Sequence, residues 1–159
     1  MSAKRDEKTA ASEADMLRLD QQLCFAAYST AHAFTRLYRP LLEKLDLTYP
    51  QYLVMLVLWE RDGLTVTQLG ERLFLDSGTL TPLLKRLESA GRIARTRDPA
   101  DERRVLITLT EDGKALRGDA RCIPPQIGKA TGLTPAEMRA LKSGLDKLRA
   151  ALTGEGETP

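Results

Sequence analysis

The sequence contains no long hydrophobic run. Its longest uninterrupted apolar stretch, Leu53–Trp59, has seven residues, whereas a membrane-spanning helix needs roughly 18. We therefore expect no membrane as a partner. The first fifteen residues, MSAKRDEKTAASEAD, carry charges of both signs and lack the apolar segment of a signal peptide. These two absences predict a cytoplasmic protein.

Cysteine and histidine are scarce. Cys24 and Cys122 lie far apart and form no CxxC pair, and a single histidine cannot complete a zinc site. In a reducing compartment both thiols are expected to be free. The acidic residues Asp98, Asp101 and Glu102 lack the loop spacing of a calcium site and suit a turn paired with arginine. We therefore expect no metal and no cofactor.

A strong net charge is also missing. The chain has 24 basic and 22 acidic residues, a formal charge of +2, so no global field attracts a polyanion. The basic residues are nevertheless concentrated, because seven Lys or Arg and four Asp or Glu fall between Lys85 and Arg104. A local excess of this kind favours contact with phosphates.

Two short helices and a tight turn are predicted in the centre of the chain, over Thr65–Leu73 and after Gly78. Four leucines of the second helix recur at i, i+3, i+4 and i+7 and form one apolar stripe, Leu80, Leu83, Leu84 and Leu87. The other face carries hydroxyl and basic groups, a pattern typical of a helix-turn-helix with a recognition helix. The candidate DNA contacts there are Ser77, Thr79, Thr81, Pro82, Lys85 and Arg86. If Ser77 caps this helix, Pro82 should distort its start.

After Gly91 the sequence becomes β-prone. Arg92–Arg97 and Val105–Leu109 flank a polar tip at 98–104 and predict a two-stranded hairpin. A hairpin bearing Arg103 can reach a minor groove beside the recognition helix. These elements together predict a mainly α fold with a small β-hairpin wing, a winged helix-turn-helix, with double-stranded DNA as partner.

The segment LTVTQLGERLFLDSGTLTPLLKRLESAGRIARTRDPADERRVLITLTEDG resembles the MarR family of winged-helix bacterial transcription regulators, and the likeness extends from about Leu19 to Leu152. The resemblance implies an intertwined homodimer on a pseudo-palindromic operator. It also implies that Asp101 supports Arg103, with Arg104 beside them at the DNA. Independently, apolar helices at both ends of so short a chain expose more hydrophobic surface than one small core covers, which predicts a dimer.

The expected organisation follows from these patterns. Residues 1–14 are predicted to be a flexible arm and residues 153–159 a flexible tail. Residues 15–152 are predicted to form one MarR-like domain. Within it, 15–62 and 111–152 supply the dimerisation helices, and 63–110 form the winged helix-turn-helix that binds DNA.

Cys24 is followed by tyrosines at +14 and +25, Tyr38 and Tyr49. This spacing resembles one MarR subgroup, the organic hydroperoxide resistance regulators, in which the matched cysteine is oxidised by peroxide and the two tyrosines hold it. Tyrosine hydroxyls can stabilise a thiolate. Similarity to the two-cysteine variety implies that Cys122 then forms a disulfide between subunits and that the repressor leaves its operator.

Other functions also fit these residues. A lone cysteine is commonly a small buried hydrophobe, and tyrosines are commonly core residues. One alternative is a MarR-type repressor released by a small aromatic or phenolic ligand, with no role for the cysteines. A thiol peroxidase and a purely structural dimerisation module are two more. The leading expectation is a regulator and not an enzyme.

Overall fold

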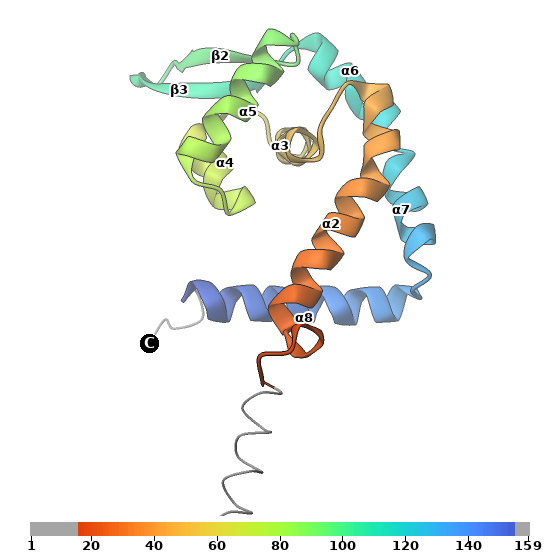
Figure 1. Cartoon of the computed structure of the whole chain (residues 1–159). Coiled ribbons are helices and arrows are strands. Elements are labelled where there is room, and N and C mark those ends of the chain that lie inside the picture. Colours follow the sequence, from red (N-terminus) through yellow and green to blue (C-terminus); the bar gives the residue numbers. More distant parts are fainter. Residues whose placement is uncertain (1–15, 155–159) are drawn as a thin grey trace, which may run out of the picture. The chain divides into compact units, whose positions relative to one another are not determined.

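The computed structural model describes residues 16–154 (Figure 1). The predicted arm at 1–14, and residues 155–159 of the tail predicted at 153–159, lie outside this range. The chain divides into two compact units, one ending at Asp119 and the other beginning at Ala120. Within residues 16–154, none of the helices combines the length and hydrophobicity needed to cross a bilayer.

The first unit begins with a short 3-10 helix η1, Leu19–Gln21, and the long helix α2, Leu23–Leu42. Pro40 lies in the last turn of α2, which ends two residues later and continues into a second 3-10 helix η2, Glu43–Leu45. The break predicted at Pro40 therefore coincides with the end of the helix. Of the residues of α2, only Leu42 is buried, so most of its apolar face is open to solvent.

Helix α3, Tyr49–Glu60, is the centre of this unit. A reciprocal capping box between Thr48 and Gln51 starts it, with Pro50 in its first turn. Seven of its residues are buried on several sides of the helix, namely Gln51, Tyr52, Val54, Met55, Val57, Leu58 and Trp59. This confirms the central helix that the uniformly apolar sequence predicted.

The helix-turn-helix and the wing follow α3. Their elements are β1 (Leu64–Thr65), α4 (Val66–Leu73), α5 (Ser77–Ser89), β2 (Ile93–Asp98), β3 (Asp101–Leu109) and α6 (Glu111–Ala120). The three strands form an antiparallel sheet in the order β1-β3-β2, in which Leu64 pairs with Ile107 and Ile93 with Leu109. The mainly helical winged fold is thus confirmed.

The wing differs in detail from the sequence prediction. Its strands continue to Asp98 and from Asp101, so the turn contains only Pro99 and Ala100. The predicted polar tip at 98–104 was therefore too long, because pairing with β2 extends β3 toward the turn. As a result, Arg103 and Arg104 lie within a strand, where side chains alternate between faces.

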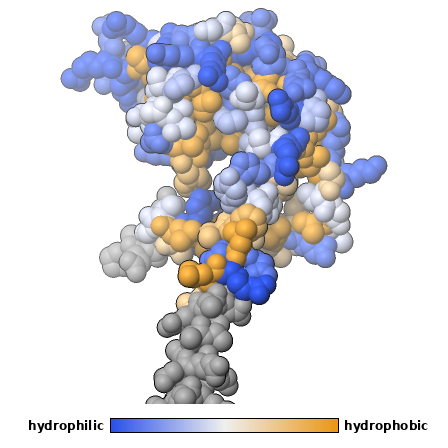
Figure 2. All heavy atoms as spheres, viewed as in Figure 1, coloured by the Kyte–Doolittle hydropathy of each residue, from blue (hydrophilic) through white to orange (hydrophobic). Residues whose placement is uncertain are grey.

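The second unit contains α7, Ile123–Thr131, and α8, Pro135–Thr153. Thr134 caps α8 in a capping box with Glu137, as the Thr-Pro-Ala-Glu sequence predicted. No residue of α8 is buried, and the predicted stripe includes Leu141 at 54% and Leu145 at 49% exposure. Figure 2 shows hydrophobic residues at the surface of this helix.

Candidate DNA interface and cysteine sites

The turn before α5 is fixed by close backbone contacts and a carboxylate. A Cβ at Gly70 would lie 2.6 Å from the carbonyl oxygen of Leu75, so only glycine lets the turn fold back over α4. Asp76 caps α5, accepting hydrogen bonds from Thr79 N at 2.8 Å and from Thr79 Oγ1 at 2.9 Å. These bonds lower the pKa of the Asp76 carboxyl. Asp76, and not Ser77, is therefore the cap.

Helix α5 separates an inner and an outer face as predicted. Leu80, Leu84 and Leu87 are fully buried, and Leu83 is partly buried. The outer face exposes most of the candidate contacts, namely Ser77, Thr79, Pro82, Lys85 and Arg86. Thr81 differs, because it is half-buried and its hydroxyl donates to the Ser77 carbonyl at 2.6 Å.

Pro82 lies in the second turn of α5, inside a helix that runs unbroken from Ser77 to Ser89. Proline has no backbone N–H, so the carbonyl of Gly78 receives no i+4 hydrogen bond from it. Because the cap lies at Asp76 and not at Ser77, Pro82 is the sixth residue of the helix, one position further from the cap than expected.

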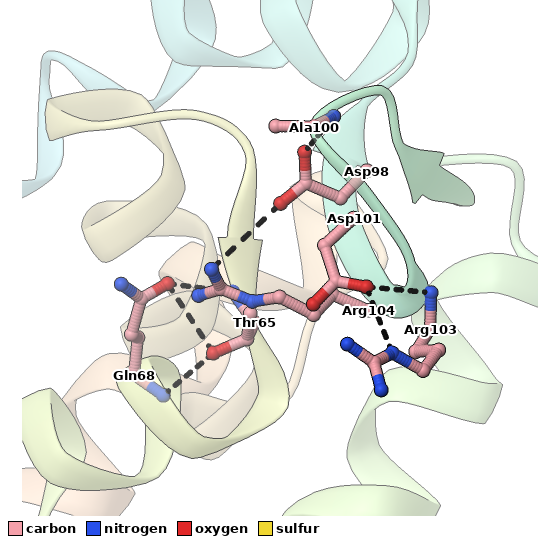
Figure 3. A network of polar contacts seen from close by, with 7 residues as sticks. All are labelled: Thr65, Gln68, Asp98, Ala100, Asp101, Arg103 and Arg104. Carbon is pink, nitrogen blue, oxygen red and sulfur yellow. Dashed lines mark hydrogen bonds and ion pairs between the residues drawn. The ribbon is translucent and has the colours of Figure 1, made fainter.

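Two carboxylates of the wing hold two neighbouring arginines (Figure 3). Asp101 Oδ1 accepts from Arg103 N at 3.2 Å and from Arg103 Nε at 3.3 Å, as the resemblance implied. Asp98 Oδ2 lies 3.9 Å from Arg104 Nη1, while Asp98 Oδ1 accepts from the Ala100 amide at 2.8 Å. Each of the two arginines therefore has a carboxylate of the wing beside it.

Contacts between distant residues connect the wing to the helices, and sequence reasoning did not find them. Arg95 Nε donates to Glu88 Oε2 at 3.1 Å, which ties β2 to α5. Asp62 Oδ1 accepts from the Leu109 amide at 2.8 Å, which ties the end of β3 to the residues after α3. Their partners are 7 and 47 positions apart, so no local motif indicates them.

Cys24 is exposed near the start of α2. Tyr38 is fourteen residues further along the same helix, which at 1.5 Å per residue places it about 21 Å away along the axis. A single chain therefore does not bring Tyr38 to its own Cys24. Cys24, Ala31 and Tyr38 are spaced by seven residues, so they follow one stripe of α2 that drifts by only about 20° per heptad.

Tyr38 and Tyr49, the two predicted thiolate-supporting residues, do lie together. Their ring centroids are 4.6 Å apart, and the ring of Tyr52 is 5.8 Å from that of Tyr38. Burial, with smaller contributions from Tyr49 and Tyr52, raises the pKa of Tyr38 to about 12. Burial also raises the pKa of Tyr49. Both phenols are therefore protonated at neutral pH and available as hydrogen-bond donors.

Cys122 belongs to the second unit and immediately precedes α7. Its side chain is exposed, and its carbonyl accepts from Gln126 Nε2 at 3.0 Å. Neither cysteine forms a disulfide in the part of the chain that the structure describes. His32, one turn beyond Tyr28 on α2, stacks edge-on against its ring at a centroid distance of 4.4 Å.

The capped helix pair and the arginine-bearing hairpin define a winged helix-turn-helix protein. A family profile described as transcriptional regulator SarA/Rot matches residues 36–119. The HTH-type transcriptional regulator TtmR of Methylorubrum extorquens is 55% identical over 148 residues, 91% of this chain and 76% of that protein. The organic hydroperoxide resistance transcriptional regulator of Bacillus subtilis is 50% identical over 131 residues, 82% of this chain and 89% of that protein.

Solved structures agree with these relatives. AbfR of Staphylococcus epidermidis has a TM-score of 0.72 at 35% identity, over 89% of this chain and 98% of that one. Reduced AbfR bound to DNA has a TM-score of 0.69 at 34% identity, over 91% and 99%. Disulfide-formed AbfR has a TM-score of 0.58 at 36% identity, over 87% and 98%. The chain belongs to the MarR family of winged-helix transcriptional regulators and is of the organic hydroperoxide resistance type.

Proposed function

We propose that this protein is a homodimeric repressor that binds a pseudo-palindromic operator while Cys24 is reduced. An organic hydroperoxide oxidises Cys24, Cys122 of the other subunit joins it in a disulfide, and the operator is released. As a regulator of transcription, it acts in the cytoplasm. The observation that carries the proposal is the stripe of α2 that the exposed Cys24 shares with Tyr38, whose ring contacts that of Tyr49.

Dimerisation is supported by two unpartnered apolar faces. On α8, Leu141 and Leu145 are about half exposed, and on α2, Leu23 and Tyr28 are exposed by more than half. Burying one such leucine fully contributes roughly 1.5–3 kcal/mol, so a second copy of the chain gains substantially by covering them. A two-fold dimer then presents its two copies of α5 to half-sites about 34 Å apart.

The dimer also completes the cysteine site. Ala31 lies midway between Cys24 and Tyr38, is exposed, and has a small side chain. If two copies of α2 cross in opposite directions at Ala31, Cys24 of each chain lies beside Tyr38 of the other. Tyr49 accompanies Tyr38 because their rings are in contact. The hydroxyls of both tyrosines can then donate hydrogen bonds to one Cys24 sulfur.

The proposed oxidation proceeds in two steps. The Cys24 thiolate attacks the terminal, hydrogen-bearing oxygen of the hydroperoxide, the O–O bond breaks, Cys24 becomes a sulfenic acid, and the alkoxide takes a proton and leaves as an alcohol. The Cys24 sulfenic acid is then attacked by the Cys122 thiolate, which forms the S–S bond and, with one proton, releases water. Cellular thiols reduce the disulfide and restore both thiols.

The disulfide affects DNA binding because its geometry is restrictive. It requires the two Cα atoms to lie within about 7 Å, so it constrains the start of α2 and the residues before α7. A coupling free energy of roughly 1–3 kcal/mol between the disulfide and the arrangement of the two winged helix-turn-helix parts lowers operator affinity about 5- to 150-fold.

The relatives support this chemistry by what their names state. The Bacillus subtilis relative is named for organic hydroperoxide resistance. AbfR has been solved reduced on DNA, overoxidised on DNA and with a disulfide formed. In the present chain, Cys24 and Cys122 are the only two cysteines available for such states.

The proposed DNA contacts combine α5 with the wing. The exposed residues of α5 reach base edges and phosphates in the major groove, and the wing arginine enters the adjacent minor groove. On α5 we assign Ser77, Thr79, Thr81, Pro82, Lys85 and Arg86, and on the wing Asp101, Arg103 and Arg104. Asp101 acts by holding Arg103.

The test combines non-reducing electrophoresis with a gel shift on DNA flanking the gene. Cumene hydroperoxide should convert the wild type into a covalent dimer and abolish its shift, and a reducing thiol should reverse both effects. In peroxide, Cys24→Ser should stay unlinked and retain its DNA complex. The matched control Cys122→Ser should also stay unlinked and retain its DNA complex, but its Cys24 should still be oxidised to the sulfenic acid. A wild type that binds DNA equally before and after oxidation would contradict the proposal.

Two further measurements separate the remaining alternatives, namely the peroxide consumed per Cys24 and the salt dependence of the DNA complex. A sensor consumes about one equivalent of peroxide per Cys24, whereas a thiol peroxidase continues to turn over when reductant is added. A purely structural dimerisation module produces no salt-sensitive complex with the duplex.

A second candidate function rests on a cavity of about 510 Å³ at the junction of α2 and α3. Its size suits a small ligand. A ligand bound there would make the protein the ligand-released repressor considered above. In that case Cys24→Ser responds to the inducer like the wild type. The cavity is lined by Thr35, Arg39, Glu43, Asp46, Leu47, Thr48, Tyr49 and Pro50.

A further inference from the structure

The turn between α4 and α5 holds a large side chain in an unusual backbone conformation. Phe74 has a φ of 56° and a ψ of 39°, in the left-handed region. Glycine adopts this region freely, and aspartate gains local hydrogen bonds there, but a bulky residue is strained. Phe74 is the one bulky residue among those of positive φ within residues 16–154, which are Asp46, Gly63, Phe74, Gly91, Gly132 and Gly154.

The path of the turn explains the backbone conformation but not the side chain. The backbone N–H groups of Phe74 and Leu75 both donate to the Gly70 carbonyl, which reverses the chain at the end of α4. Position 74 is therefore the left-handed residue that follows a helix, a place usually occupied by glycine. A glycine would form the same turn without strain, so the backbone gives no reason for a phenylalanine.

Packing of the ring offsets only part of this strain. Leu69 of α4 and Leu80 of α5 are completely buried, whereas Phe74 between them in the sequence is 51% exposed. Because hydrophobic stabilisation grows with the apolar area removed from water, a half-exposed ring gains much less than a buried one. Strain that is kept at an exposed position points to a function of the side chain.

Phe74 lies next to the end of α5 that is proposed to contact bases. It precedes the Asp76 cap by two residues, and the exposed residues Ser77 and Thr79 follow directly. In helix-turn-helix proteins, the first residues of the recognition helix contact base edges in the major groove. The exposed side chains of Asp76, Ser77 and Thr79 are polar, so Phe74 adds a large apolar group to this edge of the proposed interface.

The apolar group that a base pair presents in the major groove is the C5 methyl of thymine, and phenylalanine is among the side chains that recognise it by contact. We propose that Phe74 is a specificity-determining residue whose ring packs against one thymine methyl in each operator half-site. This inference rests on the proposed DNA-binding function and adds to it a preference for thymine at one position. The strained backbone of the turn is then retained because it carries the ring.

The experiment removes the methyl group and the ring separately. Fluorescence anisotropy of the full-length reduced protein is measured on the duplex found by gel shift, with thymines replaced by deoxyuridine at one position at a time in both half-sites. Deoxyuridine lacks only the methyl. Loss of two buried methyl contacts lowers affinity about fifteenfold, so one position should weaken the wild type by this factor and leave Phe74→Gly unaffected. The matched control Phe74→Tyr keeps the ring and should keep the full response.

A stability measurement separates recognition from a structural role. Glycine and asparagine both tolerate the left-handed region, so Phe74→Gly and Phe74→Asn should change the melting temperature by no more than about 2–4 °C. A ring that holds the turn together by packing would instead make both variants melt about 10 °C lower, and this result would overturn the inference.

The inference is also overturned if no deoxyuridine position affects the wild type more than it affects Phe74→Gly and Phe74→Asn. That result leaves the proposed function standing, because the wild type still binds its duplex. If the wild type binds no duplex from the DNA flanking the gene, the proposed function itself fails, and the inference fails with it.

Discussion

Trp59 Nε1 donates a buried hydrogen bond to the carbonyl oxygen of Gly113 at 2.8 Å, joining the end of α3 to the first turn of α6. The Thr110 hydroxyl accepts from the Gly113 amide and donates to the Gly91 carbonyl at 2.6 Å. Three elements, α3, the residues before β2, and α6, are therefore connected through Gly113. The winged part of the chain is anchored to its central helix at this point.

The first prediction concerns the donor of this bond. Trp59→Phe keeps an aromatic ring and leaves the Gly113 carbonyl buried without its donor, which costs about 1–3 kcal/mol in the free energy of unfolding. Urea unfolding followed by circular dichroism measures the loss. Unchanged stability would show that the bond contributes nothing beyond the packing of the ring.

The second prediction concerns Gly113. A Cβ at this position would overlap the carbonyl oxygen of Arg92, so Gly113→Ala forces β2 and α6 apart and lowers the melting temperature. The matched control lies in the same helix, because a Cβ at Gly118 meets nothing within 4 Å. Gly118→Ala should stabilise the protein by about 0.5–1 kcal/mol through helix propensity. Equal effects of both substitutions would contradict this account.

The third prediction concerns pH and the cap of α5. Hydrogen bonds from Thr79 lower the pKa of Asp76 from its ordinary value of 3.8. A carboxyl with a lowered pKa in the folded state stabilises the protein above its unfolded pKa and loses that contribution as pH falls through the folded pKa. Asp76→Asn retains a capping side chain that does not titrate. Its stability should therefore fall less than that of the wild type between about pH 4 and pH 2, as measured by thermal unfolding.

The fourth prediction concerns the phenols. Tyr38→Phe removes a proposed donor to the Cys24 thiolate, and a hydrogen bond to a charged group contributes about 1.5–3 kcal/mol. The rate of Cys24 oxidation by cumene hydroperoxide at pH 7 should therefore fall by at least about tenfold, as followed by thiol titration. Tyr28→Phe is the control, because Tyr28 lies beside His32 and outside the tyrosine pair. Equal rates for both variants would exclude Tyr38 from the sensor.

The fifth prediction concerns the exposed stripe of α8. A charge at Leu145 would be buried on dimerisation and would lack a partner, so Leu145→Lys should yield monomers with little affinity for the operator. Lys147→Glu, an exposed position outside the leucine stripe, should leave the dimer intact. Sedimentation velocity distinguishes the two states. A dimeric Leu145→Lys protein would place the interface elsewhere.

Much of the fold could be predicted from local patterns. The leucine stripe of α5 and the Thr-Pro-Ala-Glu start of α8 depend on neighbours within one or two turns, and both are confirmed. The approximate position of the wing followed from the change of the sequence pattern after Gly91, from helical to β-prone. These features are set by residues close together in sequence, which is why one sequence suffices to find them.

The rest depends on contacts between distant residues. Strand β1 has only two residues and exists through its pairing with β3. The short turn of the wing follows from the register that joins Asp98 to Asp101. Likewise, Cys24 and Tyr38 share a stripe that sequence spacing indicates, but their separation along one helix becomes apparent only when α2 is seen to be continuous. Tertiary pairing decides such details.

The continuity of α2 between Cys24 and Tyr38 has a genetic consequence. If each sulfur is served by the phenols of the opposite chain, defects in the two positions complement one another. Co-expressing a chain that carries Cys24→Ser with one that carries Tyr38→Phe would produce mixed pairs with one intact sensor each. Peroxide responsiveness, lost in the Cys24→Ser parent and slowed in the Tyr38→Phe parent, would then return in the hybrid.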